Sequence, residues 1–358
     1  MLCYNFENCY QFEFLYYQEY TMNKKITIYE VAKKAGVAIS TVSRVLNGSQ
    51  NVSDETNTKV KTAIKELNFR PQVSARKLAS KEPQMLAIAV PSFTTPFFNE
   101  VLKGVKDEIK KMDLDIILYN TGSKNPEEAV HNFFDRGTTD ALIILSIDIT
   151  DKIHDVLQST QTPVVLVNSS HKDYNYFMLN DYQGGYMSGE HLVKKGFERI
   201  GMINTVTKSR TSIEREKGFK DALKNYKMKI DPALFITGDS EKHGGFTEEA
   251  GFEAINKYAK MGKFPDAIFC ANDTQALGAI HAINKLGMDV PEDIALMGYD
   301  NIKFSKYMDL TTVDQKMYTT GVQATARLAE IIRNPESELY QTTINPVLVE
   351  RGSTQKSK

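Results

Sequence analysis

Residues 26–48 read ITIYEVAKKAGVAISTVSRVLNG, and this stretch decides the fold of the first part of the chain. Thr27 and Glu30 have the spacing of a capping box, in which a hydroxyl and a carboxylate satisfy free amides of a helix's first turn. Gly36 follows the small apolar residues of that helix and permits a sharp turn, because glycine adopts a positive φ without steric cost. A second helix is expected over 39–46, where apolar residues recur at helical spacing. The pattern predicts a helix-turn-helix unit.

A unit of this kind presents the beginning of its second helix to base edges in the major groove of DNA. The forked guanidinium of Arg44 can read guanine, and Ile39 can contact a thymine methyl group. Ser53 is expected to cap a third helix that runs through Leu67. A helical bundle that binds nothing would have the same core, but the turn, the spacing and the charge together favour DNA binding. The DNA contacts predicted on these helices are Thr27, Tyr29, Ile39, Ser40, Thr41, Ser43, Arg44 and Asn47.

The charge of the chain is unevenly distributed. Residues 22–82 contain twelve Lys or Arg against five Asp or Glu, a balance of +7, whereas the whole chain has a formal charge of −1. A basic block on an acidic remainder is typical of a nucleic-acid-binding head on a carrier domain. Residues 1–21 contain eight aromatic side chains and no Lys or Arg, which excludes a secretory signal. We expect translation to begin at Met22 and residues 1–21 to be a non-native or disordered extension.

From residue 83 onward, short β-rich runs alternate with helical patterns, which implies parallel sheets covered by helices on both faces. The runs are too numerous for one sheet, so we expect two lobes. Strands are expected over 85–90, 115–119, 141–145, 164–167, 177–179, 199–203, 267–270, 294–298, 311–315 and 343–350. Helices are expected over 98–112, 184–195, 214–226 and 275–286.

Ligands of open α/β sheets bind beyond the carboxyl ends of the strands, so polar residues at these ends are candidate binding groups. Phe97 and Phe98 follow the first strand, Arg215 lies near the start of a helix, and Asn272 and Asp300 each follow a later strand. An Arg, an Asn and an Asp that converge can hold vicinal hydroxyls by directional hydrogen bonds, while an aromatic ring stacks on the apolar face of a sugar.

Structural roles compete with this interpretation. Phe97 or Phe98 could belong to the core, and Arg215 and Asp300 could form an ion pair. Asp273, next to Asn272, is expected to cap the helix that follows it.

The run over 26–48 resembles the DNA-binding head of the LacI family nearly position for position. Leu67-Asn-Phe-Arg-Pro71 followed by Ala75-Arg-Lys-Leu78 resembles the hinge of that family. The resemblance implies that residues 73–80 become helical on operator DNA and that Leu78 is inserted into the minor groove. An apolar wedge between base steps costs unstacking energy but bends the DNA toward more protein. The hinge contacts implied are Ser74, Arg76 and Leu78.

The remainder resembles the periplasmic sugar-binding fold that forms the family's body, and the similarity extends to about Gly352. Arg215, Asn272 and Asp300 fall on binding positions of the family. Asn168 falls on a fourth such position, where sugar-binding members often have Asp. The resemblance therefore favours effector contact by Phe97, Phe98, Asn168, Arg215, Asn272 and Asp300.

The fold expected is a small all-α helix-turn-helix head plus an α/β, periplasmic-binding-protein-like body of two doubly wound parallel-sheet lobes. The expected division is an extension over 1–21, a head over 22–69, a hinge over 70–82, an N-terminal lobe over 83–181 plus 314–335, a C-terminal lobe over 182–313 plus 336–352, and a tail over 353–358.

These features predict a cytoplasmic, homodimeric repressor of carbohydrate-utilisation genes. It would bind double-stranded operator DNA and respond to a sugar or sugar phosphate held between the lobes. One alternative is a catabolite-control-type regulator governed by a phosphoprotein, for which Lys316, Arg327 and Arg333 are the candidate contacts. Another is a purine-responsive repressor, since purine-sensing relatives use a similar Arg and Asp pair with an aromatic stack.

Enzymatic activity finds little support. The six histidines have no convincing Ser or Cys partner, and no phosphate-binding loop of the P-loop type occurs. Cys3, Cys9 and Cys270 lack the spacing of a metal site or a disulfide framework. No apolar run approaches the roughly 18–20 residues that cross a bilayer. We therefore expect no catalytic site, no cofactor, no metal and no membrane contact.

Overall fold

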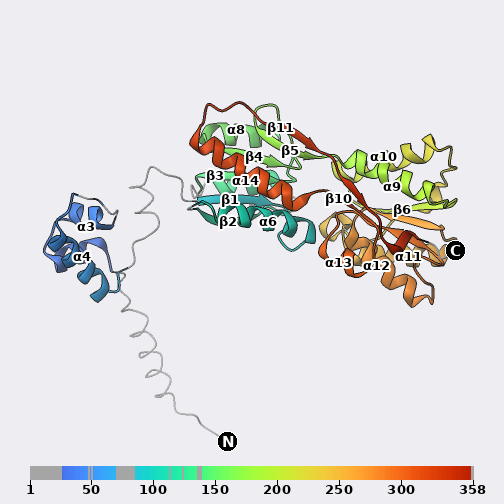
Figure 1. Cartoon of the computed structure of the whole chain (residues 1–358), viewed down its shortest axis with the longest axis horizontal. Coiled ribbons are helices and arrows are strands. Elements are labelled where there is room, and N and C mark those ends of the chain that lie inside the picture. Colours follow the sequence, from blue (N-terminus) through green and yellow to red (C-terminus); the bar gives the residue numbers. More distant parts are fainter. Residues whose placement is uncertain are drawn as a thin grey trace, which may run out of the picture. The chain divides into compact units, whose positions relative to one another are not determined.

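The computed structural model describes residues 26–46, 49, 51–69, 85–112, 114–122, 125–134 and 139–355. The chain divides into two compact units, residues 1–82, which include the head, and residues 83–358, the body (Figure 1). The expected extension over 1–21 and hinge over 70–82 lie outside the described residues. So do four of the predicted DNA contacts, namely Asn47, Ser74, Arg76 and Leu78.

The described part of the head contains helices α2 (Ile28–Ala35), α3 (Ile39–Leu46) and α4 (Asp54–Glu66). The capping box is confirmed, because the backbone N–H of Thr27 donates to the Glu30 carboxylate at 2.7 Å. Gly36 has a φ of 68°, the left-handed conformation that ends α2. Ser53 caps α4 by accepting a hydrogen bond from the N–H of Thr56. The three helices enclose a small apolar core of Val31, Ala32, Val42, Val45, Val60, Ala63 and Phe69.

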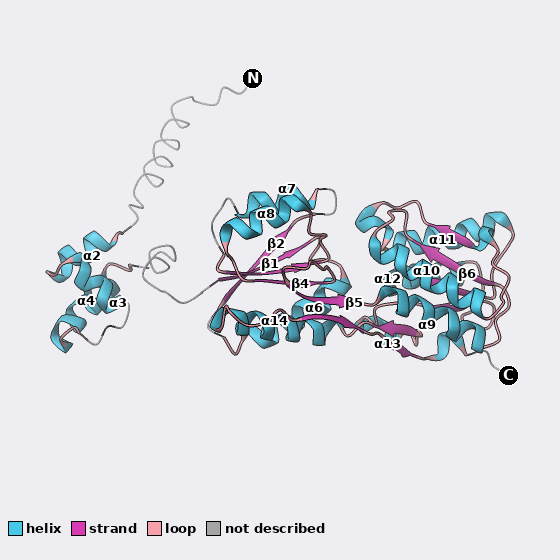
Figure 2. Cartoon of the chain, turned by 90° about the horizontal axis from the view of Figure 1, so that it is seen from above, coloured by secondary structure: helices cyan, strands magenta, loops and turns pink. Residues whose placement is uncertain are grey.

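The body contains a six-stranded parallel sheet with the strand order β11-β5-β4-β3-β1-β2. Its strands are β1 (Met85–Val90), β2 (Asp115–Asn120), β3 (Ala141–Leu145), β4 (Val164–Val167), β5 (Asn175–Leu179) and β11 (Gln341–Ile344). Figure 2 shows helices α7 and α8 on one face of this sheet and α6 and α14 on the other. These helices are α6 (Pro96–Ile109), α7 (Pro126–Phe134), α8 (Asp151–Thr160) and α14 (Met317–Arg333).

A second parallel sheet has the order β7-β6-β8-β9, and beside it β10 and β12 form an antiparallel pair. The strands are β6 (Ile200–Asn204), β7 (Phe235–Thr237), β8 (Ala267–Cys270), β9 (Ala295–Met297), β10 (Thr312–Asp314) and β12 (Val347–Val349). Helices α9 and α10 pack on one side of this sheet, and α11 and α12 pack on the other. The helices of this lobe are α9 (Asp181–Lys194), α10 (Arg210–Asn225), α11 (Glu248–Met261), α12 (Asp273–Lys285) and α13 (Lys303–Tyr307). The expected architecture of two doubly wound lobes is thus present.

One part of the expected division needs correction. The sequence predicts residues 336–352 in the C-terminal lobe, with a single last strand over 343–350. Instead, β11 pairs in parallel with β5, at the edge of the six-stranded sheet, and only β12 lies in the other lobe. The change of lobe occurs in the short segment between Ile344 and Val347, which interrupts what the sequence presents as one β-rich run.

The chain passes between the two lobes at residues 179–181, 314–317 and 344–347. Two of these segments are bonded to each other. The N–H of Asn180 donates to the carbonyl of Ile344 at 3.1 Å, and its side-chain amide donates to Oδ1 of Asn345 at 2.9 Å. In the third segment, Lys316 has a φ of 60° and its N–H donates to the Asp314 carboxylate at 2.7 Å. The crossings are therefore held by local polar contacts rather than by regular secondary structure.

Helices α9 and α10 approach so closely that their backbones touch. A Cβ atom on Gly185 would overlap the carbonyl oxygen of Arg215, and one on Gly218 would overlap that of Tyr182. Because Gly185 contacts the backbone of Arg215, this glycine fixes the distance of that residue from α9.

We predict that Gly185→Ala lowers the free energy of unfolding by about 1–3 kcal/mol, because the added methyl group must push α10 away from α9. Urea denaturation followed by circular dichroism measures the loss. The exposed Lys194→Ala on the same helix should change the stability by less than about 0.5 kcal/mol. A Gly185→Ala protein as stable as the Lys194→Ala control would contradict the close approach of the two helices.

Candidate effector and DNA-binding sites

Arg215 is the centre of a buried polar cluster at the carboxyl ends of β8 and β9. Its side chain is only 3% exposed. Its Nε donates to Oδ1 of Asp181 at 3.0 Å, and its Nη1 donates to the carbonyl of Ala271 at 2.6 Å. The guanidinium carbon lies 3.7 Å from the centre of the Tyr299 ring, and Nη1 lies 3.8 Å from Oδ1 of Asp300. The predicted proximity of Arg215 and Asp300 is thus present.

The burial of this cluster changes its acid–base chemistry. Burial raises the pKa of Asp300 to about 8, and the nearby Arg215 charge offsets only part of that effect. Gln315 donates a 2.5 Å hydrogen bond to the same carboxyl. For Arg215 itself, burial opposes the charge, but attraction to Asp181, Tyr299 and Asp300 outweighs it and raises the pKa. Arg215 therefore stays charged, whereas Asp300 can gain or lose a proton near neutral pH.

A second arginine extends the cluster to the other lobe. Nη2 of Arg210 donates to Oδ1 of Asn168 at 2.6 Å and lies 3.5 Å from Oδ2 of Asp181. Asn168, directly after β4, also donates to the hydroxyl of Ser146 at 3.0 Å. Contacts consequently run from Gln315 through Asp300, Arg215, Asp181 and Arg210 to Asn168 (residues of both lobes).

Sequence reasoning missed Asp181, Arg210 and Gln315. Asp181 offered a usable signal, because it follows the expected strand over 177–179 and begins a helix, as a ligand group at a strand end would. The sequence around Arg210 and Gln315 contains no comparable signal of a binding group.

Asn272, a predicted effector contact, has both of its side-chain groups engaged within the protein. Its Oδ1 caps α12 by accepting a hydrogen bond from the N–H of Gln275 at 2.8 Å, and its Nδ2 donates to the carbonyl of Phe246 at 3.4 Å. Effector contact by Asn272 remains a prediction.

The expected cap, Asp273, does something else. Its carboxylate accepts hydrogen bonds from the hydroxyls of Ser305 and Thr312, both at 2.6 Å, and from the N–H of Ile302 at 2.9 Å. Burial raises its pKa to about 6. The backbone N–H of Asp273 also donates to the carbonyl of Tyr299 at 2.7 Å. Asp273 therefore holds in place the segment that carries Asp300, since it bonds residues before and after it.

Phe97 and Phe98 lie in the first turn of α6 and are partly buried against the core of the six-stranded sheet. Their ring centres are 5.0 Å apart at an angle of 79°, an edge-to-face contact. A cavity of about 390 Å³ opens nearby and is lined by Pro96, Asn99, Glu100, Leu102, Lys103, Lys106, Ile302, Lys303 and Phe304. Both side chains bury part of their surface in the core of the sheet. Stacking of either ring on an effector stays a prediction.

Several buried polar atoms beside the cluster have no hydrogen-bond partner within the described part of the chain. They include Oε1 of Gln315 and Oγ of Ser169, the residue after Asn168. Oδ2 of Asp181 also accepts no hydrogen bond there, but it forms an ion pair with Nη2 of Arg210 at 3.5 Å. A buried polar atom without a partner costs free energy, and each such atom needs an explanation. The oxygens of Gln315 and Ser169 are acceptors available to a molecule with several hydroxyl groups.

In the head, the described DNA-contact candidates lie outside the apolar core. Tyr29 is 67% exposed and Ile39 is 40% exposed. On α3, the exposed or half-buried candidates lie opposite Val42 and Val45, which face the core. These α3 candidates are Ile39, Ser40, Thr41, Ser43 and Arg44.

Comparisons with known proteins agree with both parts of the molecule. Residues 27–72 match the bacterial regulatory proteins of the lacI family, and residues 190–354 match the periplasmic binding protein-like domain. A relative from Mannheimia succiniciproducens, "HTH-type transcriptional repressor PurR", is 33% identical over 338 residues, which cover 92% of this chain and 99% of the relative. The chain therefore belongs to the LacI family of DNA-binding transcriptional repressors.

Solved structures of other transcriptional regulators are similar over nearly the whole chain. The lac repressor dimer bound to operator and the anti-inducer ONPF is 27% identical, with a TM-score of 0.76 over 92% of this chain and 99% of that one. The complex of the transcriptional regulator CelR with cellobiose is also 27% identical, with a TM-score of 0.66 and the same coverage. Within the described residues, no helix is both long enough and apolar enough to span a membrane.

We predict that the free energy of unfolding declines as the pH rises from 6 to 8, in part because of Asp300. The unfolded chain loses this proton near pH 3.9, whereas the folded protein keeps it up to a pKa of about 8. Between these values the folded state binds more protons, so raising the pH destabilises it. Asp273, whose pKa is about 6, is still losing its proton at pH 6 and contributes to the slope up to about pH 7. Denaturation at several pH values measures the slope.

The variant Asp300→Asn cannot titrate and should show a flatter slope over that range. Glu336→Gln, at an exposed position, should keep the slope of the unmodified protein. Equal slopes for Asp300→Asn and the unmodified protein would show that Asp300 does not bind the proton.

Proposed function

We propose that this LacI-family protein is a cytoplasmic homodimer that represses carbohydrate-utilisation genes and responds to a sugar-like effector bound at the Arg215 cluster. The observation that carries this proposal is the continuous set of polar contacts from Gln315 to Asn168, together with buried oxygens of Gln315 and Ser169 that have no hydrogen-bond partner among the described residues. A sugar presents many hydroxyls that donate and accept in fixed directions, which such a set of groups can satisfy. The cellobiose complex of CelR supports a carbohydrate effector.

The control of DNA binding would follow from the position of these contacts. Arg210 of one lobe bonds Asn168 of the other, so an effector that competes with or reinforces this bond changes the relative stability of two lobe arrangements. An effector can shift such an equilibrium only by its difference in affinity for the two states. By linkage, an effector that weakens operator binding is itself bound more weakly by the DNA-bound protein. The operator-bound dimer of the lac repressor supports the proposed homodimer.

A purine effector is the second candidate, and it is favoured by relatives named PurR that align over nearly the whole chain. A nucleobase would need an aromatic face for stacking, which Phe97 or Phe98 is predicted to supply. Their mutual edge-to-face packing leaves less ring surface for this purpose.

The phosphoprotein alternative receives less support. Lys316 is paired with Asp314 at 3.2 Å. Arg327 is paired with Glu330 at 2.9 Å and also donates to Asn175. These cations are already engaged within the body, so they offer a weaker surface for a phosphate group.

We predict that Arg44→Ala weakens binding to the operator by about 1–3 kcal/mol, the usual value of a bidentate contact with a base. The operator is first selected from a random pool of duplexes, and binding is followed by fluorescence anisotropy at several salt concentrations. Lys111→Ala, an exposed change in the body, should leave the affinity unchanged. Equal affinity for Arg44→Ala and Lys111→Ala would refute the proposed contact.

We predict that a sugar or sugar phosphate raises the melting temperature of the protein in a concentration-dependent way, because it binds only the folded state. The panel also includes nucleobases. The shift should disappear in Asp300→Asn and Arg210→Gln and persist in Lys111→Ala. A shift with nucleobases alone would replace the sugar proposal by the purine one, and no shift across the panel would contradict both.

A further inference from the structure

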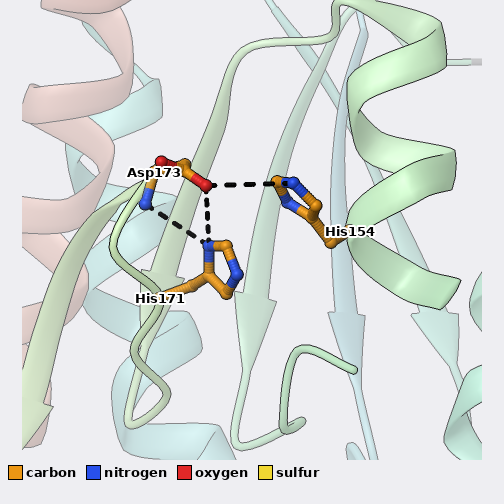
Figure 3. Close-up of side chains that lie close together, drawn as sticks. All are labelled: His154, His171 and Asp173. Atoms are coloured by element: carbon orange, nitrogen blue, oxygen red, sulfur yellow. Dashed lines mark hydrogen bonds and ion pairs between the residues drawn. The ribbon is translucent and has the colours of Figure 1, made fainter. Parts of the chain in front are cut away.

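The N-terminal lobe carries a second polar cluster, separate from the Arg215 cluster, which contains two histidines and an aspartate (Figure 3). His154 projects from α8, and His171 and Asp173 lie in the loop between β4 and β5. Nε2 of His154 lies 3.8 Å from Oδ2 of Asp173, and Nδ1 of His171 lies 3.7 Å from the same oxygen. One potential ligand atom from each residue lies within 4.8 Å of the other two.

The hydrogen bonds of His154 indicate which of its nitrogens is available. Nδ1 is 3.0 Å from the hydroxyl of Tyr174, and that hydroxyl lies 3.5 Å from the carbonyl of His154 itself, to which it can donate. A tyrosine hydroxyl that donates to the carbonyl accepts from Nδ1–H, which leaves the lone pair of the neutral ring on Nε2. Nε2 is the atom that faces Asp173. Outer partners of this kind commonly fix the ring orientation of metal-binding histidines.

The hydrogen bond of His171 also shows which of its ring nitrogens is unprotonated. The backbone N–H of Asp173 donates to Nδ1 of His171 at 3.3 Å, so this nitrogen also carries a lone pair. Two imidazole nitrogens and a carboxylate oxygen thus lie close together, and the lone pair of His171 Nδ1 becomes available to an ion when this long hydrogen bond breaks. Electron-rich atoms at this spacing repel one another unless a cation or a proton lies between them.

The cluster is held in position from outside. Tyr174 is only 8% exposed and belongs to the core beneath α8. The side-chain amide of Gln341, on β11, lies 3.3, 2.9 and 3.1 Å from the carbonyls of His171, Lys172 and Tyr174, and so fixes the loop to the edge of the sheet. The two imidazole rings lie 4.6 Å apart, centre to centre. A site supported in this way loses little entropy when it binds an ion.

We propose that His154, His171 and Asp173 form a binding site for a divalent transition-metal ion of the zinc type. Two imidazoles with one carboxylate favour such an ion over Mg²⁺ or Ca²⁺, which prefer oxygen ligands alone. Ligand atoms about 2.0–2.1 Å from a tetrahedral zinc ion are about 3.3 Å apart. Oδ2 of Asp173 lies 3.7 and 3.8 Å from the two imidazole nitrogens, and one ligand atom of each residue lies within 4.8 Å of the others, so the side chains must move closer together to surround the ion. The metal would replace the long Asp173–His171 hydrogen bond and join α8 to the β4–β5 loop, with a fourth position for water.

The test uses the full chain, titrated with Zn²⁺ in competition with a chromophoric chelator. We expect one strongly bound equivalent. Loss of a residue that only orients a metal ligand typically lowers metal affinity about 10- to 100-fold. His154→Gln and Asp173→Asn each remove a ligand, so each should lower the Zn²⁺ affinity by at least that much. Tyr174→Phe, which keeps the ring but removes the hydroxyl, should weaken it about 10- to 100-fold. His281→Gln, at an exposed position on α12, is the matched control and should bind as the unmodified protein does.

A Co²⁺ spectrum identifies the ligands independently of affinity. Visible d–d bands that are lost in Asp173→Asn, without the near-ultraviolet charge transfer of a thiolate, would agree with the proposed site. Thiolate charge transfer would assign the metal to cysteines and overturn the proposal. So would Zn²⁺ affinity equal to that of the unmodified protein in both His154→Gln and Asp173→Asn. Failure of the unmodified chain to bind Zn²⁺ would leave the cluster as a proton-bridged ion pair and would equally refute the site.

Discussion

The burial of one guanidinium is the constraint on which the rest of the body depends. Removing a charge from water costs several kcal/mol unless well-placed partners replace the water. Arg215 finds such partners in Asp181, the Ala271 carbonyl and the Tyr299 ring. These groups stand at the start of α9 and after β8 and β9, so the need to pair one charge fixes the ends of three elements relative to α10.

Packing and electrostatics act on the same residue from two sides. The backbone of Arg215 can lie against α9 only because Gly185 has no side chain, while its guanidinium reaches the carboxylate at the beginning of that helix. Asp273 then holds Ile302, Ser305 and Thr312 around the segment that carries Asp300. Asp273, a buried carboxyl that accepts three hydrogen bonds, thus supports Asp300, whose pKa of about 8 lies close to neutral pH.

The sequence predicted well those features that depend on neighbouring residues. The capping box of α2, the turn at Gly36 and the strands with continuous apolar runs, such as Ala141–Leu145, are local patterns and were confirmed. The sequence-based prediction failed where contacts with distant parts of the chain determine the structure. Strand β11 alternates between exposed and half-buried residues, so nothing in it specified β5 as its partner. Likewise, the sixteen residues between His154 and His171 conceal their contact, which only the packing of α8 beside the β4–β5 loop creates.

The pairing of β11 with β5 also bears on how the chain is made. β5 ends at Leu179, but the strand that covers its edge begins at Gln341, more than 150 residues later. During synthesis from the N-terminus, the six-stranded sheet therefore remains incomplete, with an open edge, until residues 341–344 leave the ribosome. An exposed strand edge is a template for pairing with other chains. The nascent protein thus depends on β11 to close the surface through which it would aggregate.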